Sequence, residues 1–288
     1  SPPNTAWRFL NTAFGNAFFN MATDEQLVRS VAVGDSPPTV RLFGWEPTAI
    51  SFGYAQKIAR EVDVAKTEER GIDIVRRPTG GRAVLHWNEL TYSVICPSDH
   101  SELGGNISEV YRAISQCLVN GLTQLGIDAQ LEPGKAPVPP PRGKDVTSPC
   151  FSSTSQYEIT LEGRKLVGSA QRRMGNIVLQ HGSLLIGPEH KQVVDLMPPG
   201  RERLKKAYGD QLDSHTISLR EAGHQHSFTD LAVGIRSGFT QSLQTELTDI
   251  PLSNQEQTGI SELISEKYGT PDWNQLDRSA EVTRRLII

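Results

Sequence analysis

The centre of the chain reads Arg-Arg-Pro-Thr-Gly-Gly-Arg-Ala-Val-Leu-His at residues 76–86. Strand-like runs at residues 72–76 and 90–95 bracket this stretch, so we expect its glycine pair to form a loop at the edge of a sheet. Gly80 and Gly81 allow the backbone to approach a ligand closely, and the arginines can bind an anion. A plain glycine turn with solvated arginines fits the same residues. The spacing matches neither a P-loop nor a dinucleotide-binding motif, so the stretch predicts an anion-facing loop without a nucleotide signature.

A second informative stretch reads Glu-Gly-Arg-Lys-Leu-Val-Gly-Ser-Ala-Gln at residues 162–171. It follows a strand-like segment at residues 157–161, and the Glu-Gly pair predicts a two-residue hairpin turn. This register pairs Thr160 with Lys165 and Ile159 with Leu166. Because side chains alternate along a strand, we expect Lys165, Val167 and Ser169 to share the face that points away from Ile159 and Leu166.

The remaining pattern alternates irregularly between helix-like and strand-like segments, without an internal repeat. We expect helices at residues 17–33, 61–70, 108–126, 228–247 and 253–268, with Ser108 as an N-cap and Cys117 in a buried stripe. Further strands are expected at residues 39–44, 49–53 and 177–186, and a mobile proline-rich loop at residues 132–149. This mixture is typical of an α+β fold with mixed sheets flanked by helices.

Composition limits the class of protein. The 288 residues are 37% hydrophobic and 22% charged, with a formal net charge of −4, which is typical of a soluble globular protein. The charge is too small to predict nucleic acid or a membrane surface as a partner. No apolar run approaches the roughly 20 residues that span a bilayer, and the first ten residues lack a signal-peptide pattern. We therefore expect a cytoplasmic protein, while the start at Ser1 leaves a removed leader open.

The cysteines are Cys96, Cys117 and Cys150, and they form no C-x-x-C pair, which fits a reducing compartment. Cys150 has the least core-like surroundings, because it follows the proline-rich segment and precedes a Ser/Thr run. A cysteine nucleophile needs a nearby cation to favour its thiolate, and Lys165 is the candidate. The alternative is an inert thiol and a surface lysine. Regular metal-ligand spacing is absent, so no metal site is expected.

Histidines and basic residues provide further candidates. His86 and His181 each follow an apolar strand stretch, so either is a candidate general base or a ligand to the loop, with a packing histidine as the alternative. Basic residues gather near the two motifs, and these are Arg76, Arg77, Arg82, Arg164, Lys165, Arg172 and Arg173. If the two motifs adjoin, their charges form a positive rim that favours an acidic partner.

Residues 76–86 and 162–171 together resemble the biotin/lipoate protein ligase superfamily, which contains lipoate-protein ligases and octanoyltransferases. The likeness extends from about Trp7 to Gln-His-Gly-Ser-Leu at residues 180–184 and, more loosely, to Trp273. Ser-Pro-Cys-Phe at residues 148–151 is similar to the LipM-type octanoyltransferases, which use a cysteine in that loop as acyl acceptor. Arg82 stands where the ATP-dependent lipoate ligases carry a third glycine, so the resemblance favours acyl transfer over adenylation.

The resemblance implies a single catalytic domain over residues 1–288, with its core at about 7–250 and a terminal helical segment at 251–288. It also implies a two-step transfer without ATP or another cofactor. Cys150 would take octanoyl from octanoyl-acyl carrier protein and pass it to a lysine of a lipoyl domain, such as glycine cleavage H protein or the E2 subunit of a 2-oxoacid dehydrogenase. Lys165 would favour the thiolate and stabilise the oxyanion. The implied substrate-binding residues are Arg76, Arg77, Gly80, Gly81, Arg82, Val84, His86, Val167, Gly168, Ser169, Ala170 and His181.

Three other functions remain open. An ATP-dependent lipoate or octanoate ligase would release pyrophosphate and would not need Cys150. An amidotransferase between two lipoyl domains would use the same cysteine without acyl carrier protein. A non-catalytic module would bind an acyl ligand without turnover. On family analogy we expect a monomer.

Overall fold

The computed structural model describes residues 6–134 and 157–275. Its centre is an eight-stranded mixed sheet with the order β11-β1-β2-β6-β10-β9-β8-β7. The strands are β1 (Trp7–Gly15), β2 (Thr39–Trp45), β6 (Glu89–Pro97), β7 (Gln130–Pro133), β8 (Tyr157–Leu161), β9 (Arg164–Met174), β10 (Ile177–Leu185) and β11 (Leu247–Asp249). β1 pairs in parallel with β2 and β11, and the other neighbours pair antiparallel.

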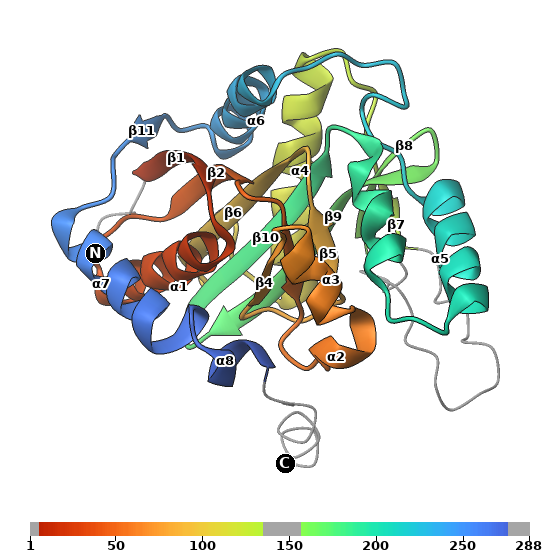
Figure 1. The fold of residues 1–288 in the computed structure, drawn as a ribbon. Helices are drawn as coiled ribbons and strands as arrows, with labels where there is room; N and C mark the ends of the chain where they lie inside the picture. The colour runs from red at the N-terminus through yellow and green to blue at the C-terminus, as the bar shows by residue number, and fades with distance from the viewer. Residues whose placement is uncertain (1–5, 135–156, 276–288) are drawn as a thin grey trace.

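A second sheet has three strands in the order β4-β3-β5 and lies in front of the large sheet in Figure 1. It consists of β3 (Ala49–Phe52), β4 (Asp73–Arg76) and β5 (Val84–His86). Around it lie α2 (Ile58–Glu61), α3 (Val64–Glu69), the 3-10 helix η2 (Pro188–Leu196) and α5 (Glu202–His215). A separate apolar cluster that includes Phe52, Leu85 and Leu212 holds these elements together. The glycine loop at residues 77–83 therefore connects two strands of a small, independently packed sheet.

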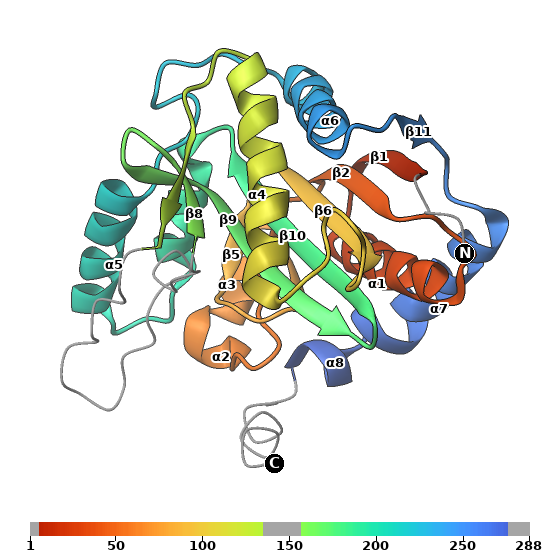
Figure 2. The ribbon, with the colours of Figure 1, turned by 180° about the vertical axis from the view of Figure 1, so that it is seen from behind.

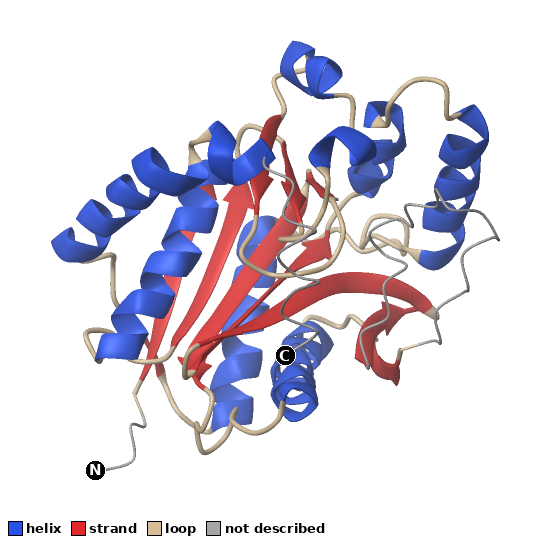
Figure 3. Ribbon diagram, turned by 90° about the horizontal axis from the view of Figure 1, so that it is seen from below, coloured by secondary structure: helices blue, strands red, loops and turns tan. Residues whose placement is uncertain are grey.

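Helices cover both faces of the large sheet (Figures 1, 2 and 3). α1 (Ala17–Val33) packs on the face that carries Ile95 and Leu179, with α7 (Asn254–Leu263) beside it. α4 (Ile107–Gln124) and α6 (Phe228–Leu243) cover the opposite face, where Val94 belongs to the largest apolar cluster. Val94 and Ile95 serve different cores because side chains alternate along β6. In the described part of the chain, no helix combines the length and apolar character needed to cross a membrane.

Two glycines let α4 and α6 approach each other closely. A Cβ atom on Gly238 would lie 2.4 Å from the carbonyl oxygen of Cys117, and one on Gly121 would lie 2.6 Å from the carbonyl oxygen of Gly234. Any side chain at these positions would push the helices apart. Cys117 therefore lies in a helix-packing core, as its place in the apolar stripe predicts.

The α+β class and most of the expected elements are confirmed. The helix at residues 17–33 has the predicted bounds, because the Asn16 side chain caps its first turn and Gly34, at a φ of 84°, ends it. The helix expected at residues 61–70 is confirmed only from Val64 to Glu69, since Asp63 caps α3 by accepting a hydrogen bond from the Lys66 amide and Glu61 ends the separate helix α2. The N-cap of α4 is Asn106 and not Ser108, because Asn106 forms a capping box with Glu109.

Other differences concern strands and chain ends. The pattern did not predict β1, which has nine residues, or β5, β7 and β11, each of which has four residues or fewer. α6 ends at Leu243, and the expected helix at residues 253–268 divides into α7 and a π-helical turn, Ile264–Tyr268, before α8 (Pro271–Gln275). The expected loop at residues 132–149 begins inside β7, and residues 135–149 lie outside the described residues.

The predicted hairpin forms, but with one change of register. Thr160 pairs with Lys165, whereas Ile159 pairs with Val167 and not with Leu166. The extra residue makes a β-bulge, which moves the side chains after it to the other face of the strand. Val167 therefore points to the core beside α4, while Gly168 and Ala170 take the face of Lys165.

Candidate active site

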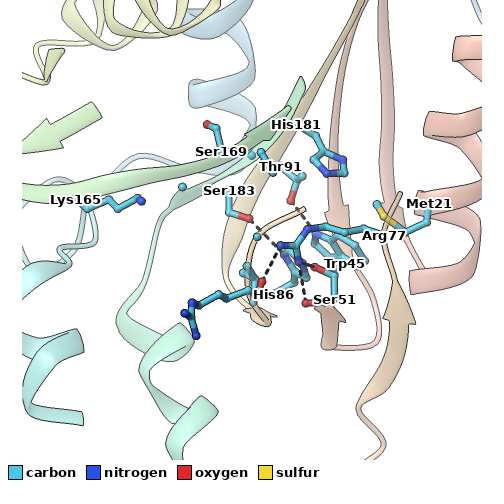
Figure 4. Close-up of a pocket in the computed structure, with 16 residues that line it drawn as sticks. Met21, Trp45, Ser51, Arg77, His86, Thr91, Lys165, Ser169, His181 and Ser183 are labelled. Atoms are coloured by element: carbon cyan, nitrogen blue, oxygen red, sulfur yellow. Dashed lines mark hydrogen bonds between the residues drawn. The ribbon is translucent and has the colours of Figure 1, made fainter. Parts of the chain in front are cut away.

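A pocket that is partly open to solvent lies between the two sheets (Figure 4). The glycine loop and β5 line one side with Arg77, Gly81, Arg82, Val84 and His86. Strands β9 and β10 line the other side with Lys165, Gly168, Ser169, Ala170 and His181. The two sequence motifs, which lie far apart along the chain, therefore meet in one cavity.

Some of the predicted site residues lie elsewhere. Val167 belongs to the core between the sheet and α4, because the β-bulge turns its side chain to that face of the strand. Gly80 is exposed and does not line the pocket. Cys150 lies outside the described residues.

Arg76 is tied into the protein interior. Its side chain is fully buried, and its guanidinium donates hydrogen bonds to the carbonyl oxygens of Tyr54 and Gln56, each at 2.8 Å, and of Trp273 at 3.0 Å. Its backbone amide donates to the side-chain oxygen of Asn274 at 2.8 Å. Arg76 therefore joins the base of the glycine loop to the end of the described chain, and it does not line the pocket.

Arg77 clamps the glycine loop from inside. Its guanidinium donates to the carbonyl oxygens of Gly80 at 2.8 Å, Arg82 at 2.7 Å and Ser51 at 3.0 Å. The loop also comes very close to the strand below it, since a Cβ atom on Gly53 would lie 2.0 Å from the carbonyl oxygen of Gly81. Arg77 thus donates its hydrogen bonds mainly to backbone carbonyl oxygens. The expected positive rim therefore does not form from Arg76 and Arg77.

Arg172 extends from β9 toward the same loop. Its guanidinium donates to the carbonyl oxygen of Pro78 at 2.5 Å and lies over the ring of Tyr54, 5.0 Å from the ring centre. Arg82 is the arginine that lines the pocket in a half-buried position without an ion pair among the described residues. A positive charge at the pocket therefore comes from Arg82 and Lys165.

His181 is the centre of a buried hydrogen-bonded chain. Its Nδ1 lies 3.0 Å from Asp24 Oδ2, and its Nε2 lies 2.6 Å from Thr79 Oγ1. Asp24 also accepts hydrogen bonds from Arg41 and Ser93, both at 2.7 Å. Because a carboxylate only accepts, His181 donates through Nδ1, and a neutral ring accepts the Thr79 hydroxyl at Nε2. This chain links α1, β10 and the glycine loop.

Burial and hydrogen bonding determine the charge states of His181 and Asp24. Burial lowers the pKa of His181, and this effect outweighs the opposing influence of Asp24. Burial alone raises the pKa of Asp24, but the charge of Arg41 and the hydrogen bonds from His181 and Ser93 hold that pKa below its usual value. The result is a neutral imidazole beside an ionised carboxylate.

His86 forms a second buried chain. Its Nδ1 lies 2.8 Å from Glu89 Oε1 and its Nε2 lies 2.7 Å from Ser51 Oγ. The same oxygen of Glu89 accepts hydrogen bonds from Thr91 at 2.6 Å and Ser183 at 2.7 Å. Burial raises the pKa of Glu89, but the interaction with His86 and these hydrogen bonds hold it below its usual value. Glu89 is therefore an ionised acceptor that orients His86.

The apolar part of the pocket comes from different elements. Trp45 stacks on His86 with ring centres 3.9 Å apart and an angle of 11° between the rings. Met21 of α1 and Val84 of β5 add aliphatic surface, and Gly168 and Gly182 leave room in the strands. A Cβ atom on Gly182 would lie 2.6 Å from the Gly168 carbonyl oxygen, so β10 accepts no larger residue at this position without movement. The pocket suits an aliphatic chain whose polar end lies near Lys165.

Lys165 approaches the pocket from the side opposite Met21 (Figure 4). Its Nζ lies 3.0 Å from Glu158 Oε1 of β8, and its side chain is mostly buried. An ammonium ion at the rim of an apolar slot is placed to donate a hydrogen bond to a carbonyl oxygen of a bound acyl group.

Sequence reasoning missed several of these polar residues. Asp24, Ser51, Glu89 and Glu158 come from α1, β3, β6 and β8, so each reaches its partner only through the tertiary fold. Glu89 lies three residues after His86, which was the one local signal for a pair. Among the described residues, no group of three His, Cys, Asp or Glu side chains is arranged to hold a metal ion.

Comparison with known proteins identifies close sequence relatives. Residues 16–239 match the family described as the lipoyl protein ligase A/B catalytic domain. The chain is 38% identical to the octanoyltransferase LipM of Kyrpidia tusciae, with 93% of this chain and 98% of that protein covered. It is 36% identical to the octanoyltransferase LipM of Staphylococcus aureus, with 93% of this chain and 97% of that protein covered.

Solved structures share the fold. A lipoate-protein ligase A bound with ATP gives a TM-score of 0.75 at 24% identity, with 94% of this chain and 98% of that chain covered. A bipartite lipoate protein ligase from Thermoplasma acidophilum gives a TM-score of 0.76 at 22% identity, with 94% of this chain and 96% of that chain covered. At these identities the likeness extends to the fold alone.

Proposed function

The chain belongs to the lipoyl protein ligase A/B catalytic domain family, and from this premise we propose that it transfers octanoyl from acyl carrier protein to a lysine of a lipoyl domain. The proposal follows the octanoyltransferases that are 34–38% identical to the chain over 93% of its length. One structural observation supports it most directly. Among the described residues, the pocket joins an apolar slot to the ammonium group of Lys165, which matches an aliphatic acyl chain that ends in a reactive carbonyl.

The apolar slot supplies binding energy for the acyl chain of the substrate. Each methylene that leaves water contributes about 0.8 kcal/mol, so an eight-carbon chain gains several kcal/mol along Met21, Trp45 and Val84. Lys165 then lies at the carbonyl end, where negative charge develops on oxygen when a nucleophile adds. The glycine loop and the hydrogen-bonded networks around His86 and His181 maintain the conformation of the slot.

We place the nucleophile at Cys150, which lies outside the described residues, on the sequence argument alone. Its thiolate would attack the thioester of octanoyl-acyl carrier protein, and the carrier thiol would leave. The lysine amine of a lipoyl domain would then attack the octanoyl-cysteine thioester and release the enzyme thiol. The donor already carries activation as a thioester, so the reaction needs no ATP. The acceptor is a lipoyl domain of the kind found in glycine cleavage H protein or in the E2 subunit of a 2-oxoacid dehydrogenase. We propose a cytoplasmic monomer that consists of one catalytic domain.

Intact mass spectrometry tests the proposal. The purified protein is mixed with octanoyl-acyl carrier protein without ATP, and a lipoyl domain is added last. We expect one octanoyl mass on the wild-type protein, none on Cys150→Ala, and transfer of that mass to the lipoyl domain. Cys117→Ala tests the specificity of the adduct, because burial raises the pKa of the Cys117 thiol to about 11 and so suppresses its thiolate.

The same experiment separates the alternative functions. Modification of the lipoyl domain only with octanoate and ATP would identify a ligase and return Cys150 to an inert thiol. Transfer from an octanoylated lipoyl domain without acyl carrier protein would identify an amidotransferase. Bound octanoate without any transfer would identify a binding module.

A further inference from the structure

The register of the hairpin creates an ion pair beside the pocket. Lys165 pairs with Thr160 across β8 and β9, and Glu158 lies two residues before Thr160 on the same strand face. Lys165 Nζ therefore reaches Glu158 Oε1 at 3.0 Å. The side chains are 8% and 15% exposed, so water screens this pair much less than a surface pair.

The backbone of Lys165 is fixed on two sides. Thr160 pairs with it on β8, and the segment after α5 forms a parallel bridge through Thr216. The amide of Ile217 donates to the Lys165 carbonyl oxygen at 3.0 Å. Because its backbone is fixed and its ammonium group donates to Glu158, the Lys165 side chain has a defined orientation at the edge of the pocket (Figure 4).

We propose that Glu158 is a positioning residue that holds the Lys165 ammonium directed at the reacting carbonyl, so that Lys165 acts in acyl transfer as a charged hydrogen-bond donor. The inference rests on the proposed function and assigns a role to a residue that lies in neither sequence motif. A lysine side chain is long and flexible, and the hydrogen bond from Lys165 Nζ to Glu158 Oε1 limits the directions that it can take.

The proton balance of the transfer agrees with this role. In the second step, the neutral amine of the acceptor lysine forms a C–N bond to the octanoyl carbon while the C–S bond breaks. The proton that the nitrogen loses goes to the departing thiolate, so the products are an amide and a thiol. Lys165 keeps its protons throughout and stabilises the negative oxygen of the intermediate.

Other charged groups face the same region. Arg77, Arg82, His86 and His181 line the pocket with Lys165. On β7, Glu132 lies directly opposite Glu158, so it shares the strand face of the ion pair. On η2, His190 Nε2 lies 2.8 Å from Thr216 Oγ1, and burial lowers the pKa of His190 to about 4. Among these groups, Glu158 is the carboxylate whose oxygen contacts Lys165 Nζ.

The test is the kinetics of octanoyl transfer from octanoyl-acyl carrier protein to a lipoyl domain for Glu158→Gln. We expect kcat to fall about tenfold with KM for the donor changed less than twofold, because the ammonium is no longer held toward the oxyanion. A rise in KM for the donor with an unchanged kcat would overturn the positioning role.

Matched variants isolate the positioning role. Glu132→Gln removes the carboxylate opposite Glu158 and should keep the wild-type kcat. Glu158→Asp keeps a carboxylate at the same position and should recover part of the kcat that Glu158→Gln loses. If Glu158→Gln fails to fold, Glu158→Asp takes its place, with a smaller fall in kcat.

The failure of this inference can be told apart from failure of the proposed function. If the wild-type protein shows no transfer from octanoyl-acyl carrier protein, the proposed function is wrong. If the wild type transfers octanoyl and Glu158→Gln keeps the wild-type kcat, the positioning role of Glu158 is overturned while the function stands.

Discussion

Arg77 shows how one residue at the site acts through structure. A guanidinium offers five N–H donors in a planar fork, which suits acceptors in several directions. Arg77 directs these donors at the carbonyl oxygens of Ser51, Gly80 and Arg82, so it shapes the loop that lines the pocket. An anion in the pocket would have to compete with three backbone carbonyls for this charge.

Arg77→Lys tests this structural role. A lysine keeps the charge but cannot span the same carbonyls, so we expect a loss of about 1–3 kcal/mol in the free energy of unfolding, together with reduced transfer. Urea unfolding and transfer kinetics measure the two effects. Arg164→Lys is the control, since Arg164 pairs with the exposed Glu162 and should change stability by less than about 0.5 kcal/mol. An increase in KM for the donor with unchanged stability would show that Arg77 binds an anion instead.

Asp24→Asn tests the buried chain behind His181. It leaves the fully buried Arg41 without its charged partner, so we expect a loss of about 3–5 kcal/mol at pH 7. The folded-state pKa of Asp24 lies below its ordinary value of 3.8, so ionised Asp24 stabilises fully above that pH, and its contribution disappears as the pH falls through the folded value. Urea unfolding at a series of pH values should show the largest gap between the two proteins at neutral pH and a narrowing gap in acid. A gap that stays constant into acid would contradict the role of the Asp24 charge.

At the residue scale, the local motif included Gly81, Arg82, Val84 and His86, which line the pocket, but it also included Arg76 and Gly80, which do not. It did not separate Arg76 from Arg77. Arg76 bonds toward Trp273 and Arg77 toward Ser51, and neither partner is visible in the local sequence. A residue type indicates what a side chain can bind, whereas the fold determines which group it meets.

At the scale of elements, the hairpin shows why a correct turn does not ensure a correct site. The Glu-Gly turn predicted the pairing of Thr160 with Lys165, and this pairing is confirmed. One bulged residue then placed Val167 in the core and Gly168 at the pocket. Bulges change the direction of every later side chain but leave a weak trace in hydrophobic alternation. Lys165 was therefore predictable and Val167 was not.

The packing of α4 against α6 yields an element-scale prediction. Gly238→Ala places a Cβ atom 2.4 Å from the Cys117 carbonyl oxygen, so we expect a loss of about 1–3 kcal/mol in the free energy of unfolding. Gly209→Ala in α5 is the matched control, because no atom lies within 4 Å of its added Cβ. It should stabilise the protein by about 0.5–1 kcal/mol, since alanine favours helix. Thermal and urea unfolding of both variants measure the effects, and equal changes in the two would refute close helix packing as the cause.

At the scale of the whole molecule, the pocket depends on segments from most of the chain. Met21 and Trp45 come from α1 and β2 near the start of the chain, and Lys165 and His181 come from β9 and β10. The base of the glycine loop is held by Trp273 and Asn274, close to the end of the described residues. Such contacts between distant segments cannot be predicted from local periodicity, because no pattern in α8 specifies Arg76 as its partner.

Asn274→Ala tests this link between the end of the described chain and the pocket. The Asn274 side chain accepts from the Arg76 amide at 2.8 Å and donates to the Tyr268 carbonyl oxygen at 2.6 Å, so its loss leaves buried polar groups unpaired. We expect a loss of about 1–3 kcal/mol in stability and a looser glycine loop. Limited trypsin digestion measures the loop directly, with faster cleavage after Arg82 expected in the variant. Gln275→Ala changes the exposed neighbour in α8 and should match the wild type. Equal cleavage rates in all three proteins would show that the loop keeps its shape without this clamp, through its contacts with Arg77, Arg172 and His181.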